Sequence, residues 1–183
     1  MTASVSEVGF RIRHLQRLET AQVEELSGLL IDCVAGGASV SFMHPLSLEK
    51  ATAFWQRVAE RVGQGHTALL VGEDEDGIAG SVQLILDLPE NQPHRADVAK
   101  LLVHRRARRR GLGGALIEAA ERLACDRGRR LLVLDTVPGS DAERLYTRLG
   151  WQRCGVIPDY ALMPDGTPCA TAYFYRQLAP IAG

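Results

Sequence analysis

The feature that most constrains this chain is an apolar segment that runs through an arginine- and glycine-rich loop into an amphipathic helix. Residues 96–103 form the expected strand, residues 105–114 the loop, and residues 113–127 a helix whose apolar side chains share one face. The first amides of a helix lack partners within the helix, and the helix dipole favours an anion beside them. Glycines in such a loop let phosphate oxygens approach the backbone. The segment therefore predicts a site for a phosphate-bearing ligand.

The spacing of the glycines separates this loop from two common nucleotide-binding motifs. It does not follow Gly-x-Gly-x-x-Gly, and no Lys-Ser/Thr pair follows the glycines. It does follow Arg/Gln-x-x-Gly-x-Gly/Ala, with Arg108, Gly111 and Gly113 in the defining positions. Five arginines between Arg105 and Arg110 leave two alternatives open, a nucleic-acid-binding patch and a solvent-exposed basic turn.

Hydrophobic periodicity places strands and helices along the rest of the chain. Helices are expected at 20–33 (with Thr20 as N-cap), 48–62 and 141–149, and strands at 8–15, 67–72, 78–86, 131–134, 151–156 and 170–178. The strand–loop–helix–strand centre implies a crossover between parallel strands, with antiparallel meanders before and after it. This pattern predicts one domain over residues 1–183, built as a mixed α/β sheet with helices on both faces.

Composition limits the class of protein. A net charge of −1 argues against a chain that binds nucleic acid or a membrane through its overall charge. The four cysteines show neither Cys-x-x-Cys nor Cys/His ligand spacing, so we expect neither a disulfide framework nor a metal site. No apolar stretch is long enough to span a bilayer, and we expect a cytoplasmic protein. The oligomeric state stays open, with a homodimer among the alternatives.

The phosphate loop and a second motif resemble the GNAT acetyltransferase superfamily. The second motif runs from Ala142 to Trp151 and matches A-x-x-L/F-Y-x-x-x-G-F/W, with Tyr146 as its tyrosine. The resemblance implies a sheet splayed at its centre, acetyl-CoA as cosubstrate without a metal, and Tyr146 as general acid toward the departing thiolate. A phenol suits that role because its ordinary pKa is close to that of a thiol. The implied cofactor-binding residues are Leu101, Leu102 and Val103 on the strand and Arg108, Arg109, Arg110, Gly111, Leu112, Gly113 and Gly114 in the loop and helix start.

An amine acceptor is protonated at neutral pH and must lose a proton before it attacks a thioester. Asp135 ends the apolar strand at 131–134, and Asp97 lies on the strand that leads into the loop. Carboxylates on buried strands cost free energy unless they have partners, so each is a candidate for binding the ammonium or accepting its proton. We favour Asp135, with His104 as a further candidate. For both carboxylates the alternative is a structural ion pair or a loop cap.

Several other segments resemble the tabtoxin resistance acetyltransferases, which acetylate the amino group of a β-lactam amino-acid toxin. These segments are residues 36–43, 94–101, 134–136, 158–160 and 164–166. The resemblance implies that residues 38–43 lie over an acceptor site that includes Ser39, Phe42, Asp97, Asp135 and Tyr160. At residue 97 the relatives carry Glu, and Gly139 stands where many members of the superfamily carry Asn.

These observations together predict an N-acetyltransferase that moves the acetyl group of acetyl-CoA to the primary amine of a small molecule. Direct transfer in a ternary complex is expected, with an amino-acid-like antibiotic or toxin as the acceptor class. Two alternatives stay open. One is acetylation of a protein or peptide amine, and the other is a noncatalytic module that binds acyl-CoA or nucleic acid.

Overall fold

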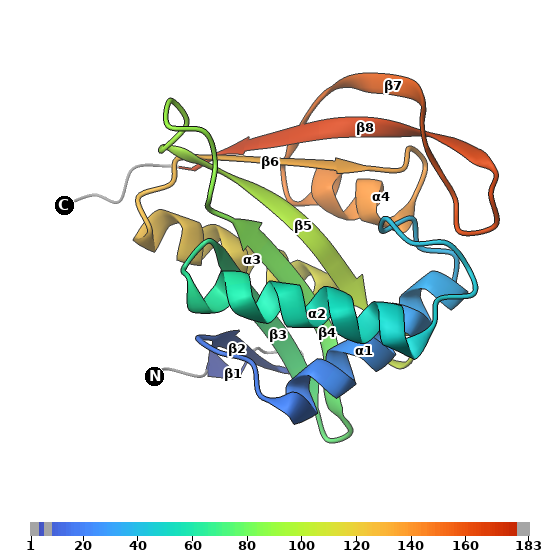
Figure 1. The fold of residues 1–183 in the computed structure, drawn as a ribbon. Helices are drawn as coiled ribbons and strands as arrows, with labels where there is room; N and C mark the ends of the chain where they lie inside the picture. Colours follow the sequence, from blue (N-terminus) through green and yellow to red (C-terminus); the bar gives the residue numbers. More distant parts are fainter. Residues whose placement is uncertain (1–3, 6–8, 179–183) are drawn as a thin grey trace.

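The computed structural model describes residues 4–5 and 9–178, and the strands in this part of the chain form one mixed sheet (Figure 1). The helices are α1 (Thr20–Ala35), α2 (Leu48–Gly63), α3 (Leu112–Asp126) and α4 (Asp141–Arg148), with a short 3-10 turn, η1, at Arg105–Ala107. The strands are β1 (Ser4–Val5), β2 (Arg11–Leu15), β3 (Thr67–Asp74), β4 (Gly77–Ile85), β5 (Arg95–Val103), β6 (Leu131–Thr136), β7 (Gln152–Leu162) and β8 (Pro168–Gln177). Their order in the sheet is β1-β2-β3-β4-β5-β6-β8-β7.

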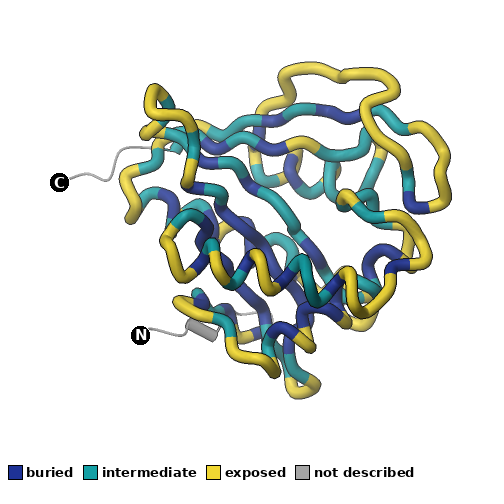
Figure 2. The backbone as a smooth tube through the Cα atoms, in the orientation of Figure 1, coloured by how far each residue is buried: buried dark blue, intermediate teal, exposed yellow. Residues whose placement is uncertain are grey.

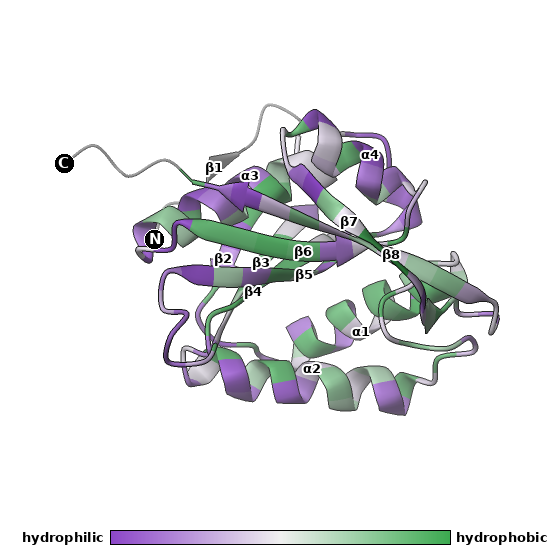
Figure 3. Cartoon of the chain, turned by 90° about the horizontal axis from the view of Figure 1, so that it is seen from above, coloured by the Kyte–Doolittle hydropathy of each residue, from purple (hydrophilic) through white to green (hydrophobic). Residues whose placement is uncertain are grey.

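Helices cover both faces of the sheet, as the sequence predicts. Seen from above, α1 and α2 lie on one side and α3 and α4 on the other (Figure 3). Each face has its own apolar core. Side chains from α1 and α2, including Leu26, Leu30 and Trp55, form one core, whereas Leu116 and Ile117 of α3 belong to the other. The sheet is therefore a middle layer between two helical layers.

The sheet divides at its centre, between β5 and β6. These two strands run parallel but pair only at Arg95–Leu131, Ala96–Leu132 and Asp97–Val133. Beyond residue 97, β5 continues along β4, and β6 pairs with β8 through Thr136. Figure 1 shows β5 and β6 separating toward the side where α4 lies. The splay that the resemblance implied is confirmed, and it leaves a wedge between the two halves of the sheet.

Three expectations about the elements differ from the structure. Residue 8, the start of the first expected strand, lies outside the described residues, and β2 begins at Arg11. The N-cap of α1 is Glu19 rather than Thr20, and the Glu19 amide donates to the Gln22 side chain at 3.0 Å. β7 continues to Leu162 instead of ending at residue 156. The single domain over 1–183 stays a prediction.

The sequence pattern did not predict the full length of β7 because neither face of this strand is buried. All eleven residues are exposed (Figure 2), so no alternation of apolar and polar side chains marks the strand. The strand also carries Pro158, in a stretch where its register against β8 shifts between Ile157 and Ala161. Proline fits an edge strand or a bulge because it has no amide to donate. Pairing with β8, and not side-chain burial, defines this strand.

The packing of α3 on β4 depends on the absence of a side chain at Gly80. A Cβ there would lie 2.9 Å from the Leu102 carbonyl oxygen and 2.9 Å from Leu112 Cδ2. We expect Gly80→Ala to lower the free energy of unfolding by about 1–3 kcal/mol because backbone and helix must both shift. Gly28→Ala is the matched control, since Gly28 is exposed on α1 with no atom within 4 Å of its added Cβ. Urea denaturation should show a stability for Gly28→Ala equal to or above that of the parent, and equal stability of both variants would contradict the packing argument.

Candidate active site

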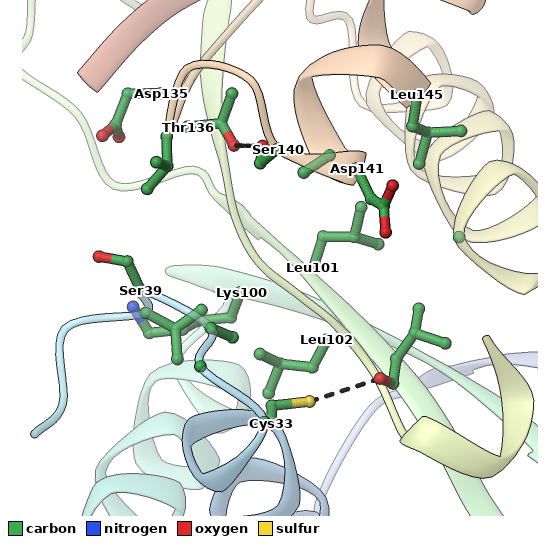
Figure 4. A pocket seen from close by; sticks show the side chains of 18 of the residues that line it. Cys33, Ser39, Lys100, Leu101, Leu102, Asp135, Thr136, Ser140, Asp141 and Leu145 are labelled. Carbon is green, nitrogen blue, oxygen red and sulfur yellow. Dashed lines mark hydrogen bonds between the residues drawn. The ribbon is translucent and has the colours of Figure 1, made fainter. Parts of the chain in front are cut away.

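A cavity of about 970 Å³ lies where β5 and β6 diverge (Figure 4). It extends from the first turn of α3 to the loop between α1 and α2. Within the described part of the chain, β5, β6, the start of α4 and the β7–β8 hairpin supply the remaining walls. One end is therefore bounded by a helix N-terminus and the other by polar side chains from several elements.

The first turn of α3 presents backbone amides to this cavity. Its N-cap is Gly111, with φ of 82°, and no side chain caps the helix. A left-handed residue at this point favours glycine, and Arg109, with φ of 59°, adopts the same region without being one. A Cβ at Gly113 would lie 3.2 Å from Leu145 Cδ2 and 3.7 Å from Val103 Cγ2. Glycine at residue 113 thus allows α3 to approach both α4 and β5 closely.

Two of the five loop arginines are engaged by carboxylates of other elements. The Arg105 amide and Nε donate to Asp32 on α1 at 2.9 and 2.7 Å. The Arg106 guanidinium lies 3.1 Å from Asp74 at the end of β3, and this hydrogen bond lowers the pKa of the Asp74 carboxyl. These arginines anchor the loop to the body of the protein.

The other arginines separate into two groups. Arg108 and Arg109 line the cavity, and Arg108 Nε donates to the Val103 carbonyl at 3.3 Å. Arg110 does not line it, since its guanidinium lies 4.7 Å from the centre of the Phe10 ring. The basic run is therefore not one uniform patch, and only part of it faces the site.

Tyr146 lies on α4. Its ring packs in the apolar core and also forms part of the cavity wall. Tyr146 is 5% exposed, and its ring centre is 5.7 Å from that of Trp151 and 6.2 Å from that of Phe174. Its hydroxyl makes no hydrogen bond with any described residue. Burial, and secondarily the charge of Asp135, raise the pKa of the phenol. Tyr146 therefore stays protonated throughout the neutral pH range.

The two candidate carboxylates have different surroundings. Asp135 lines the cavity, where it is exposed and accepts a hydrogen bond from Thr171 Oγ1 at 2.7 Å. Asp97 does not line it and forms an ion pair with Arg95. His104 is the N-cap of η1, where its Nδ1 accepts a backbone amide at 3.2 Å. Of these two candidates, Asp135 is therefore the one that lines the cavity.

The loop between α1 and α2 meets the β7–β8 hairpin across the far end of the cavity. The His44 amide donates to the Pro164 carbonyl at 2.9 Å, and Ser39 Oγ donates to the Leu162 carbonyl at 3.5 Å. Tyr160 lies on the hairpin, half-exposed at the cavity wall. This end is therefore bridged by hydrogen bonds between segments that are more than a hundred residues apart in the chain.

Most of the predicted site residues line this one cavity. They are Ser39, Phe42, Leu101, Leu102, Val103, Arg108, Arg109, Gly111, Leu112, Gly113, Gly114, Asp135, Tyr146 and Tyr160, whereas Asp97 and Arg110 do not. Sequence reasoning missed several polar lining residues, among them Lys100, Thr136, Ser140, Asp141, Arg148 and Thr171. The chain has only two lysines, Lys50 and Lys100, beside nineteen arginines, and this bias was the available signal for Lys100.

Residues 4–5 and 9–178 include no helix with the length and hydrophobicity of a bilayer-spanning segment. Nor do they contain a group of three or more His, Cys, Asp or Glu side chains that could hold a metal ion.

Solved structures of low sequence identity share the fold. An N-acetyltransferase from Staphylococcus aureus Mu50 is 16% identical with a TM-score of 0.76, and the alignment covers 93% of this chain and 99% of that one. A ribosomal-protein-alanine N-acetyltransferase from Brucella melitensis is 22% identical with a TM-score of 0.76, covering 91% and 99%. A protein from Salmonella typhimurium, solved with its cofactor acetyl-CoA, is 18% identical with a TM-score of 0.75, covering 96% and 97%.

A family model matches the central part of the chain. Residues 65–153 match the family model of the acetyltransferase (GNAT) domain, and this span contains β3 to α4, including the splayed strands and the start of α3. The central part of the chain is therefore similar to this domain.

The cavity contains a cysteine whose surroundings suppress its reactivity. Cys33 is 2% exposed, and its Sγ lies 3.6 Å from the Val103 carbonyl oxygen (Figure 4). Burial raises the pKa of the thiol to about 11, so the thiolate fraction at pH 8 is on the order of 10⁻³. We expect iodoacetamide at pH 8 to modify exposed Cys154 at least about a hundredfold faster than Cys33, as measured by peptide mass spectrometry. Both should react alike in urea, and rapid native labelling of Cys33 would contradict this account.

Proposed function

We propose that the chain transfers the acetyl group of acetyl-CoA directly to the primary amine of a small molecule within a ternary complex. The observation that carries the proposal is the single cavity in the splay, which joins an uncapped helix N-terminus at one end to Asp135 and Tyr146 farther along. An anion-binding end and a proton-transfer end in one space suit a phosphate-bearing donor and an amine acceptor.

The residues around the α3 start fit the diphosphate of coenzyme A. The first-turn amides of α3 and the Arg108 and Arg109 guanidiniums would hold it, because amides at a helix start and arginines both favour phosphate. The free edge of β5 at residues 101–103 would bind the pantetheine and acetyl groups through main-chain groups that pair with no strand on that side. Bound there, acetyl-CoA supplies an acetyl thioester. The fold shared with the Salmonella protein that holds acetyl-CoA supports this assignment.

Two side chains would move the protons. The Asp135 carboxylate would bind the acceptor ammonium and accept its proton, directly or through water, so that the amine lone pair can attack the thioester carbonyl. The Tyr146 phenol would protonate the leaving thiolate, and its raised pKa keeps that proton available at neutral pH. On becoming an amide the ammonium loses two protons, one to Asp135 and then to solvent before the attack and one as the tetrahedral intermediate collapses. The C–S bond breaks in that collapse and the sulfur gains one proton, so the acetyl group can pass directly from the thioester to the amine.

The bridged end of the cavity supports a small acceptor over a peptide. A peptide substrate needs an open groove in which several residues can lie extended. The His44–Pro164 and Ser39–Leu162 hydrogen bonds cross the place where such a groove would run. The resemblance to the tabtoxin resistance acetyltransferases supports an amino-acid-like antibiotic or toxin as the acceptor class.

Arg108 lines the cavity and Arg110 does not, and this difference provides a test of the proposed coenzyme A site. We expect Arg108→Ala to weaken coenzyme A binding about tenfold, because a charge-assisted contact to phosphate is lost. Arg110→Ala is the matched control and should bind like the parent, since Arg110 stacks on Phe10 outside the cavity. Isothermal titration calorimetry measures both. Equal losses would show that the basic cluster acts as a whole, and absence of coenzyme A binding by the parent would overturn the proposed function.

Tyr146→Phe tests the proton donor. We expect kcat to fall about a hundredfold or more with coenzyme A affinity unchanged, because the variant keeps the packed ring and lacks the acid. Free-thiol release from acetyl-CoA across a panel of small amines, amino acids and peptides measures turnover and acceptor class together. Tyr175→Phe is the control, since Tyr175 bonds Gln152 on the neighbouring strand outside the cavity. An unchanged kcat would remove Tyr146 from the mechanism, and a preference for peptides would refute the small-molecule acceptor.

A further inference from the structure

We infer that Lys100 recognises a carboxylate on the acceptor, so that the substrate class is a free amino acid or close analogue and not a simple amine. The inference rests on the proposed function and assigns a specificity-determining role to a residue that neither motif of the superfamily includes. It predicts that the acceptor carries its anionic group at a defined distance from its amine.

The backbone at Lys100 aims its side chain away from the regular course of β5. Its φ is 51°, in the left-handed region that few residues other than glycine adopt. The strand is irregular here, since the register against β4 shifts between Ser81 and Gln83, and Ser81 Oγ donates to the Lys100 carbonyl at 3.3 Å. Bulges redirect side chains, and strained residues persist where the surrounding structure holds them. This irregularity places the lysine side chain at the cavity wall.

The ammonium group of Lys100 has spare hydrogen-bonding capacity. Nζ donates to Ser41 Oγ at 3.1 Å and lies 5.8 Å from the centre of the Phe54 ring. None of the ion pairs within 4.0 Å among the described residues includes Lys100, although an ammonium has three donors. The side chain is partly buried, and burial lowers its pKa while the more distant Asp135 raises it. A desolvated cation with one neutral partner favours an incoming anion.

The position of Lys100 separates its anion from the phosphates of the donor. Lys100 contacts Ser41 of the loop between α1 and α2, at the end of the cavity that the hairpin bridges. The amides and arginines proposed for the diphosphate lie at the other end, around Gly111. Lys100 therefore faces the acceptor.

Asp135 and Lys100 together give the acceptor end a charge of each sign. Figure 4 shows Asp135 on the β6 side and Lys100 on the β5 side, with Ser39 near the space between them. A zwitterion matches this arrangement, with its ammonium at Asp135 and its carboxylate at Lys100. An amine without an acid group would leave the lysine charge uncompensated.

The decisive experiment compares amino acids with the amines that lack only their carboxylate. The pairs are L-methionine with 3-(methylthio)propylamine, L-lysine with cadaverine, and L-2,4-diaminobutanoate with 1,3-diaminopropane. For each pair, the ratio of kcat/KM for the acid to that for the amine is measured by thiol release. We expect the parent to favour the acids, and Lys100→Met to reduce the ratio about tenfold or more mainly through KM, without lowering kcat/KM for the amines. Lys50→Met, on the exposed face of α2, is the control and should keep the parent ratio.

A second measurement needs neither turnover nor a folded variant. Reductive dimethylation of the intact enzyme, read by peptide mass spectrometry, reports the two lysines separately. We expect N-acetyl-L-methionine with coenzyme A to slow modification of Lys100 but not of Lys50, and N-acetyl-3-(methylthio)propylamine to slow neither. The role of Lys100 is overturned if Lys100→Met keeps the parent ratio of kcat/KM for acid over amine, or if both acetylated compounds protect Lys100 equally. In either case, thiol release with any amine leaves the acetyltransferase proposal intact. Lack of thiol release and of coenzyme A binding would instead refute the proposed function itself.

Discussion

The splay between β5 and β6 is the constraint on which the rest of the site depends. Three residue pairs join the strands before they part, and the two halves of the sheet are then held by different partners. β4 and α3 hold β5, whereas β8 pairs with every residue of β6 from Leu131 to Thr136. Backbone groups that lose a ladder need other partners. At Val103 these are Arg108 Nε and the Cys33 thiol, so part of the loop and of α1 keeps the wedge open.

The basic loop shows how one residue type serves several purposes within six positions. Arg105 forms an ion pair with Asp32 on α1, and Arg106 forms one with Asp74 at the end of β3. With two anchors on different elements, the segment that follows is fixed before any ligand binds, including the left-handed backbone at Arg109. Preorganisation of this kind lowers the ordering cost of binding an anion. The same run of arginines therefore contains both the support and the contact surface of the loop.

Sequence patterns predicted the features that depend on local order along the chain. The strand, loop and helix from residue 95 to 126 form one contiguous unit, so motif spacing located it, and periodicity located α1, α2 and α4. Features that depend on contacts between distant segments could not be predicted from the sequence. Arg110 and Asp97 were expected in the site, but Phe10 and Arg95 are their neighbours instead. The scarcity of lysine marks Lys100 in the sequence, but the direction of its side chain depends on the bulge, because regular alternation along β5 gives no reason for it to point into the cavity.

Under the proposed function, the surroundings of Cys33 decide whether the enzyme could carry the acetyl group covalently. A cysteine in the wall of an acyltransferase cavity is a potential covalent carrier, since thiolates attack thioesters readily. Its thiol lies against the Val103 carbonyl, and burial raises its pKa to about 11 even with the Arg108 charge nearby. The nucleophilic form is thus suppressed where a two-step route would need it. Asp135, by contrast, is exposed and lines the same cavity, so under the proposed function its carboxylate would be accessible to an acceptor amine that attacks the thioester directly.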